Sequence, residues 1–372
     1  MRVGIDCRLW SVSTGRYIRE IVGRIAEKDS KNEYVVFFLT KDINKVTFPT
    51  NFKKVAVDIH WHTFKEQFFL PFIFMKERLD VLHVPYFNVP VFYPKRFVST
   101  IHDLTILKID TGRASTRSYL FYKIRKLGAW IAFWIAVLRS YKVLTVSEFV
   151  KADIVKQFHI KPENVIVTTN AVSNSFVRAS EEKIRFTLEK YKIKQPYLFY
   201  VGNAHPHKNV EGLITAFEKV HSKKSDLQLV LGGEKHFFHE RLEREWSSKP
   251  IFNSLNFVGY IDEDDLPALY SGAELFVNPS FFEGFGLQLL EAFSCGTKVA
   301  CSNSTSLPEV GGDAAYYFDP KDTDDMAKPI ILALDDKADV KVKLGYERTK
   351  KFSWNESAQK TLKVYEDCFS SR

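Results

Sequence analysis

The sequence predicts an α/β fold in which two facing, Rossmann-like, doubly wound domains enclose an interdomain cleft. A chain of 372 residues is long enough for two domains of ordinary size. Short apolar runs alternate with amphipathic segments along it, which is typical of parallel sheets covered by helices. This series weakens after Asn174 and begins again at Tyr197. We therefore expect an N-terminal domain at 1–180, a C-terminal domain at 181–352, and a final helix at 353–372 that packs back on the N-terminal domain.

Each expected strand is a short apolar run followed by a helical pattern. In the first domain these runs are 3–6, 34–39, 55–57, 81–84, 97–102, 143–147 and 165–168. In the second they are 197–202, 227–233, 256–261, 274–279, 298–302 and 314–319. The first helix of the second domain has a single apolar stripe, and Asn209 is its expected N-cap. Ligands of such sheets bind at the carboxyl ends of the strands, so we expect the site there.

Composition and charge restrict the class of protein. Hydrophobic residues make up 45% and charged residues 26%, which excludes a disordered or collagenous chain. Residues 1–180 hold 28 Lys and Arg against 15 Asp and Glu, and the remainder holds 25 against 30. A basic first half favours an anionic partner, whether a membrane surface, a nucleic acid or a phosphorylated substrate.

The cysteines and the N-terminal residues indicate a cytoplasmic protein. The four cysteines form no CxxC pair and have no zinc-type spacing, so we expect neither disulfides nor a structural metal. The first residues enter a strand-like run and lack the features of a signal peptide. The longest apolar run, 127–138, would cover about 18 Å of a roughly 30 Å hydrocarbon layer, which is too short to span it.

The strongest local signal for a ligand site lies at residues 279–291, between an expected strand and a helix. Gly284 and Gly286 permit a tight turn at the helix entrance, where backbone N–H groups and the helix dipole favour an anion such as a diphosphate. Glu283 precedes this helix, and Glu291 follows about 12 Å along it. The alternative is a loop glutamate and a solvated helix glutamate with no ligand.

Three further segments follow expected strands. Gly15 and Arg16 open the first helix, where a glycine lets the backbone approach a phosphate. Lys208 occupies the same position in the second domain and would supply a positive charge, or it is a surface lysine at a helix start. His102 and Asp103 end a buried strand, and the alternative for the histidine is a satisfied polar group of the core.

At these motifs the sequence resembles the retaining family-four glycosyltransferases (glycosyl transferases group 1) of the GT-B fold, especially bacterial mannosyltransferase-like members acting on surface polysaccharide. The resemblance runs nearly end to end. It is carried by Gly4–Leu9, Ile101–Leu104, Thr145–Phe149, Tyr200–Gly202, His207–Asn209, Phe257–Tyr260, Glu283–Glu291 and Ser306–Val310.

The resemblance implies transfer of a hexose, with mannose our first choice, from a nucleotide sugar to a glycan or lipid-linked glycan, with retention of anomeric configuration and without a divalent metal. No cofactor is implied, and GDP-mannose is the favoured donor. The implied catalytic residues are Glu283, Lys208, His102 and Asp103. The implied donor-binding residues are Glu291, which would contact the ribose, together with Phe285, Gly286, Leu287, Gly15, Arg16, Asn203, His207, Gly259 and Tyr260.

Two departures from the family pattern affect the diphosphate contacts. The loop at 14–17 is about two residues shorter than in many members, and Asn203 stands where many have arginine. The diphosphate then depends on Lys208, the helix entrance at Gly286, and Arg16 or His207.

The basic first domain suits a lipid-linked acceptor and peripheral contact with an anionic membrane at its inner face. Residues 119–126, followed by the apolar run 127–138, combine aromatics with flanking cations, and residues 68–76 have the same character. The alternative for such a run is a buried core helix.

Two other functions remain open from the residues. A nucleotide-sugar epimerase shares the architecture and would convert the donor without an acceptor. A nucleic-acid-binding protein could use the basic half, although no nucleic-acid-binding motif occurs, so we expect no nucleic acid partner. A dehydrogenase is disfavoured because no GxGxxG follows a strand.

Overall fold

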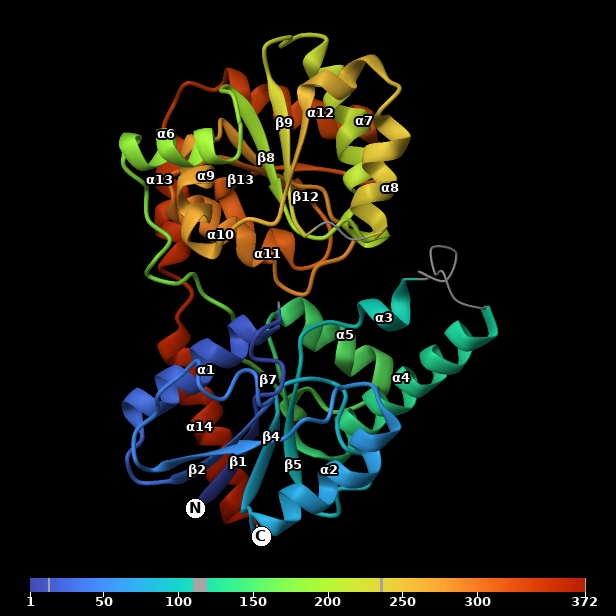
Figure 1. The fold of residues 1–372 in the computed structure, drawn as a ribbon, viewed down its shortest axis with the longest axis vertical. Helices are drawn as coiled ribbons and strands as arrows, with labels where there is room; N and C mark the ends of the chain where they lie inside the picture. Colours follow the sequence, from blue (N-terminus) through green and yellow to red (C-terminus); the bar gives the residue numbers. More distant parts are fainter. Residues whose placement is uncertain (13, 110–118, 235–236, 372) are drawn as a thin grey trace. The chain divides into compact units, whose positions relative to one another are not determined.

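The computed structural model describes residues 1–12, 14–109, 119–234 and 237–371, and the chain divides into two compact units. The N-terminal unit comprises Met1–Asn170 and Ser353–Arg372, and the C-terminal unit is Ala171–Phe352. Each unit is an α/β sandwich around one parallel sheet (Figure 1). The sequence-based boundary at residue 180 therefore lies inside the C-terminal unit, whereas the final segment belongs to the N-terminal one.

The N-terminal sheet has seven parallel strands in the order β3-β2-β1-β4-β5-β6-β7. Their bounds are β1 Arg2–Asp6, β2 Glu33–Phe38, β3 Phe52–Ala56, β4 Val81–Val84, β5 Phe97–Ile101, β6 Ser140–Thr145 and β7 Val165–Val167. The chain adds β2 and β3 on one side of β1 and then crosses back to place β4 on the other side. The strand order therefore reverses between β1 and β4, where a doubly wound sheet has its binding crevice.

Helices cover both faces of this sheet (Figure 1). Their bounds are α1 Gly15–Lys28, α2 Phe64–Lys76, α3 Thr105–Lys108, α4 Tyr119–Arg139, α5 Glu148–Phe158 and α14 Trp354–Ser370. Leu82 and Val84 of β4 share a core cluster with buried residues of α2, α4 and α5. His83, between them, faces the other side, where its Nδ1 lies 2.6 Å from the hydroxyl of Tyr365 on α14.

The C-terminal sheet has six parallel strands in the order β10-β9-β8-β11-β12-β13. Their bounds are β8 Tyr197–Val201, β9 Gln228–Gly232, β10 Leu255–Gly259, β11 Leu275–Asn278, β12 Val299–Ser302 and β13 Ala315–Phe318. Its helices are α6 Glu181–Lys190, α7 Val210–His221, α8 Phe237–Trp246, α9 Leu266–Gly272, α10 Leu287–Ser294, α11 Leu307–Gly311, α12 Thr323–Asp335 and α13 Val340–Thr349. Here the strand order reverses between β8 and β11.

The expected strands agree with the structure. Every expected run overlaps one of the thirteen strands in the described part of the chain, because most of these parallel strands are buried and largely apolar. All four cysteines are free and buried. Among the helices in the described part of the chain, none is long and apolar enough to cross a membrane.

Candidate active site

The segment between β11 and α10 places Glu283 at the carboxyl end of the C-terminal sheet. Gly286 is the residue before α10 and has a φ of 90°. The positive φ favours glycine, and a Cβ atom at this position would lie 2.4 Å from Cδ2 of Leu307, so that side chain would also have to move. The turn into α10, and with it the position of Glu283, depends on this residue.

The Glu283 carboxylate is held by a cation and a hydroxyl. Lys208 Nζ lies 2.8 Å from both carboxylate oxygens. Ser280 Oγ donates to Oε1 at 2.8 Å. The two charged side chains are largely buried, with 16% of Lys208 and 11% of Glu283 exposed. The structure thus brings together two of the predicted catalytic residues, whose positions are 75 apart in the sequence.

The surroundings of Glu283 favour its charged form. Burial alone would raise the pKa of its carboxyl, but the Lys208 ammonium, the Ser280 hydroxyl and His207 hold this pKa below its ordinary value. A fixed negative charge therefore lies beside a fixed positive charge in a partly dehydrated position. Such a pair interacts more strongly than it would in water.

The loop between β8 and α7 is fixed to the Glu283 loop through its backbone. The carbonyl of His207 accepts from the Phe281 N–H at 2.8 Å. Asn209 has a left-handed backbone (φ 55°), and its side-chain amide donates to the carbonyls of Pro279 at 3.1 Å and Pro320 at 2.7 Å. Asn209 was expected to cap α7. It stands at the N-cap position, but its side chain joins three loops and makes no capping bond.

These two loops follow the adjacent strands β8 and β11, between which the strand order reverses. The general rule for open α/β sheets places ligands at this point. The Lys208–Glu283 pair therefore stands where a ligand of the C-terminal sheet is expected, beside the N-terminal end of α10.

The remaining predicted residues of the β11–α10 segment are directed inward. Glu291 is 2% exposed and accepts a hydrogen bond from the Tyr270 hydroxyl at 2.8 Å. The Phe285 ring is buried and packs edge-on against Phe352 at 5.4 Å between centroids. Phe285 and its neighbours Gly286 and Leu287 can therefore serve an anion through backbone N–H groups at the helix entrance.

Three predicted donor residues lie at the ends of β8 and β10. The exposed Asn203 accepts from the Tyr200 hydroxyl at 2.6 Å through its backbone carbonyl. Gly259 ends β10 with a φ of 74°, and the Tyr260 side chain that follows is 67% exposed. Since all strands of this sheet are parallel, these residues lie at the same edge as Glu283.

In the N-terminal unit, the local backbone gives Gly15 a reason to be glycine besides the expected approach to a phosphate. A Cβ atom here would lie 2.1 Å from the carbonyl oxygen of Trp10 and 2.4 Å from that of Leu9. The glycine thus lets α1 begin directly against the chain's own loop. Arg16 follows it on α1 and is half-buried.

His102 and Asp103 follow β5 and are both anchored locally. His102 Nε2 lies 3.1 Å from the Pro85 carbonyl, which can only accept, so this nitrogen carries the proton. Burial lowers the pKa of His102, although Pro85 and Asp103 act in the opposite direction. Asp103 Oδ1 accepts from the Thr105 N–H at 2.7 Å, at the start of α3.

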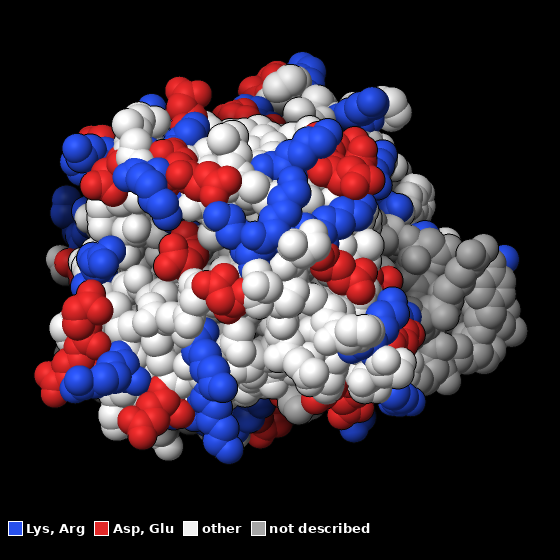
Figure 2. Space-filling view, turned by 90° about the horizontal axis from the view of Figure 1, so that it is seen from above, with Lys and Arg blue, Asp and Glu red and all other residues white. Residues whose placement is uncertain are grey.

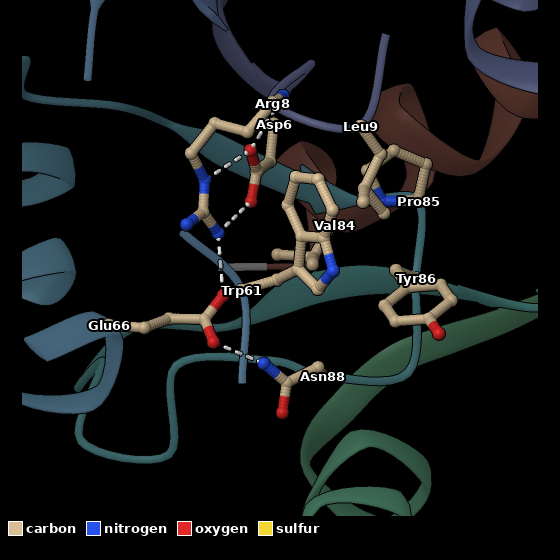
Figure 3. Close-up of a pocket in the computed structure, with 9 residues that line it drawn as sticks. All are labelled: Asp6, Arg8, Leu9, Trp61, Glu66, Val84, Pro85, Tyr86 and Asn88. Carbon is tan, nitrogen blue, oxygen red and sulfur yellow. Dashed lines mark hydrogen bonds and ion pairs between the residues drawn. The ribbon is translucent and has the colours of Figure 1, made fainter. Parts of the chain in front are cut away.

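A buried ionic cluster, which the sequence did not predict, lies at the strand-order reversal of the N-terminal sheet (Figure 3). Arg8 contacts Asp6 at 2.7 Å and Glu66 at 2.8 Å, and all three side chains are almost fully buried. Asn88 donates to the other oxygen of Glu66. Burial raises the pKa of Glu66, an effect to which Asp6 adds and which Arg8 opposes.

This cluster borders a small cavity that is also lined by Trp61 and Tyr86 (Figure 3). Arg8 follows β1 and Asn88 follows β4, so the two strands that flank the reversal both contribute. The only sequence signal was the charged pair Asp6 and Arg8 directly after an apolar strand, because Glu66 is 58 positions from Arg8. Among the residues that the structure describes, no group of three or more His, Cys, Asp or Glu is arranged to hold a metal ion.

Comparison with known proteins identifies the family. Residues 15–176 match the family model Glycosyltransferase Family 4, and residues 180–351 match Glycosyl transferases group 1. O-antigen chain mannosyltransferase B of Escherichia coli is 32% identical over 291 residues, which cover 77% of this chain and 74% of that protein.

Solved structures agree on the fold. Sucrose-phosphate synthase from Thermosynechococcus elongatus superposes with a TM-score of 0.78 over the whole of both chains, at 18% identity. Anabaena HepE in complex with UDP and glucose gives 0.77 over 99% of this chain and 100% of that one, at 14% identity. The two parallel sheets and these structural neighbours show that the chain has the GT-B fold. Because family models match both halves of the sequence, the chain is a GT-B glycosyltransferase that belongs to the family-four, group 1 glycosyltransferases.

Proposed function

We propose that this glycosyltransferase is a retaining hexosyltransferase that moves mannose from GDP-mannose to a glycan or lipid-linked glycan in surface polysaccharide synthesis. The observation that carries the proposal is the Lys208–Glu283 pair at the reversal point of the C-terminal sheet, beside the glycine-dependent entrance of α10. The choice of mannose and of polysaccharide as acceptor rests on the name of the E. coli relative.

The chemical requirement is stabilisation of the charge that grows on the departing diphosphate. An ammonium has three N–H groups, and in Lys208 two directions are taken by the oxygens of Glu283, which leaves donor capacity for a phosphate oxygen. The backbone N–H groups of 285–287 add the positive end of α10. Preorganised donors of this kind stabilise the transition state without reorganisation during the reaction.

The other residues take supporting roles in this proposal. Glu283 lies near the transferred sugar, Glu291 near the ribose, and Gly259 and Tyr260 near the base. On the N-terminal side, His102 contacts a hydroxyl of the donor sugar, and its unprotonated Nδ1 can accept from that hydroxyl.

A second group completes the diphosphate and acceptor contacts. Asn203, His207, Gly15 and Arg16 contribute to diphosphate binding, and Asp103 lies near the acceptor. No divalent metal enters the proposed reaction, so transfer is expected to persist in EDTA.

Donor binding and product analysis test the proposal. A nucleotide sugar at 100 times its Kd should stabilise the fold by about 2.7 kcal/mol, which thermal shift detects, and GDP-mannose should give the largest shift. Incubation with the donor and a mannan-type acceptor should extend the acceptor through α linkages, which retain the anomeric configuration of the donor. Conversion of the donor without acceptor would instead indicate an epimerase.

Site variants test the role of the pair. Glu283→Ala should abolish transfer, and Lys208→Ala should lower kcat by about 10² to 10³. Wild-type turnover by the Glu283 variant would remove this site assignment.

A further inference from the structure

The N-terminal unit exposes large apolar side chains on α2, on α4 and on the loop at Val91–Tyr93. Phe64 and Phe72 of α2 are 87% and 70% exposed, and Trp130 and Trp134 of α4 are close to half exposed. Monomeric soluble proteins rarely leave contiguous apolar area of this kind uncovered, and such patches mark interaction sites. We call this surface the aromatic face and define it by Phe64, Phe68, Phe72, Phe92, Trp130 and Trp134.

Ring, side-chain and backbone contacts make this face continuous. The Phe68 ring of α2 stacks on the Phe92 ring of the loop at 5.2 Å. The N–H of Val91 donates to the side chain of Gln67 on α2 at 2.8 Å. From the other side, Arg139 at the end of α4 donates to the carbonyls of Val91 and Tyr93, both at 2.6 Å. The loop therefore lies between the two helices.

Both helices have a second, buried face, so the exposed apolar residues are not required for the core. Leu70 and Phe74 of α2 and Phe133 and Ala136 of α4 are buried in one cluster. The apolar run 127–138 is thus neither wholly core nor wholly surface: α4 is apolar on both sides. A helix that buries one apolar face in the core and exposes aromatic side chains on the other fits the plane of a membrane interface.

The charges around the aromatic face indicate which kind of partner binds there. The described charged side chains that α2 and α4 present at the surface are all positive: Lys65, Lys76, Lys123, Lys126 and Arg139. The single acid of these helices, Glu66, is buried against Arg8. The side chains of 119–122 and 125, part of the segment that the sequence analysis singled out, lie outside the described residues. By contrast, the face in Figure 2 mixes both signs of charge.

We propose that the aromatic face docks on an anionic lipid bilayer, with α2 and α4 in the interfacial plane. Aromatic rings enter the boundary between headgroups and acyl chains, and the cations contact lipid phosphates. The proposal extends the proposed function, because a lipid-linked acceptor is held at such a surface. It rests on exposed side chains, however, and not on the donor site.

Vesicle binding tests the proposal directly. The full chain is sedimented with vesicles of phosphatidylglycerol and phosphatidylcholine, and with phosphatidylcholine alone. Wild-type protein should bind the anionic vesicles, and binding should weaken as salt is raised. Leu127 is 60% exposed and, three residues before Trp130, extends the aromatic face along α4. The triple variant Phe64→Ser, Phe72→Ser, Leu127→Ser removes well-exposed apolar groups and should lower the partition coefficient by about tenfold or more.

A matched control carries Phe186→Ser and Leu332→Ser. The side chains of Phe186 and Leu332 are 63% and 61% exposed in the C-terminal unit, and this control should bind as wild type does. Lys65→Glu with Lys76→Glu should also lower binding, by about thirtyfold or more, since each cation near an anionic surface contributes about 1 kcal/mol.

Three outcomes would overturn the proposal. They are equal binding of the triple variant and its control, equal binding to neutral and anionic vesicles, and a concentration-dependent dimer in light scattering that the triple variant alone abolishes. The last would show that a second copy covers the face. The thermal shift with GDP-mannose should be unchanged in the triple variant, so failure of docking is distinguishable from failure of the donor assignment.

Discussion

Removal of either partner of the Lys208–Glu283 pair should destabilise the fold, and removal of both should restore part of the loss. With only 16% and 11% of these side chains exposed, a single substitution leaves a charge that water cannot fully solvate. Breaking a buried pair in this way costs about 3 to 5 kcal/mol. We expect Lys208→Met and Glu283→Gln each to cost about 3 kcal/mol, the lower end, because both side chains still reach solvent.

Urea unfolding of the two single variants and the double variant measures the coupling. The coupling free energy should be about 2 to 3 kcal/mol. A coupling below about 0.5 kcal/mol, with both single variants as stable as wild type, would refute the reasoning. Turnover should stay low in the double variant even where stability returns, which separates the role in transfer from the role in folding.

The pH dependence of the same variants gives an independent check. The folded-state pKa of Glu283 lies below its ordinary value of 4.5, so its charge stabilises the fold above that pH. This contribution should be lost as pH falls below 4.5 through the folded-state pKa. The stability difference between wild type and Glu283→Gln should shrink over that range.

Three further predictions concern single positions. Gly286→Ala should cost about 1 to 3 kcal/mol in urea unfolding and abolish the thermal shift by donor, because of its positive φ and the nearby Leu307 side chain. Burial, with a contribution from the His102 charge, lowers the pKa of His83 to about 3, so wild-type stability should fall as pH drops below 6.5, and His83→Gln should flatten this slope. Arg8→Met leaves two buried carboxylates without a cation and should cost about 3 to 5 kcal/mol, well above Glu66→Gln; equal costs in urea unfolding would contradict this order.

The strands could be predicted because most are apolar along much of their length, but the residues at which they begin and end depend on neighbouring strands. β6 begins at Ser140, three polar or half-buried residues before its apolar run, since Ser140 pairs with Phe97 of β5. The position of Asn209 was predicted correctly, yet its bonds to Pro279 and Pro320 were not, since they join loops that are distant in sequence.

The candidate site also has parts that a local sequence pattern predicts and parts that depend on distant residues. Glu283 and Gly286 belong to one local segment, so their spacing indicated a site. The Arg8–Glu66 contact depends on how α2 packs on the sheet, which no local pattern encodes. The sequence of α4 is apolar on all sides of the helix, so its buried face and its exposed face could not be told apart from the sequence alone. The structure separates them because Ala132 and Ala136 sit on the side that approaches the sheet.

Helix α14 makes the N-terminal unit discontinuous in the chain. Residues 353–372 are translated after the whole of Ala171–Phe352, yet they supply Tyr365 for the buried hydrogen bond with His83 and pack against α1. On the ribosome, the C-terminal unit is therefore complete before the N-terminal unit has all its parts, which reverses the usual order of domain folding. An expression fragment that stops at residue 170 should expose the surface that α14 covers and aggregate, whereas 171–352 is a contiguous piece.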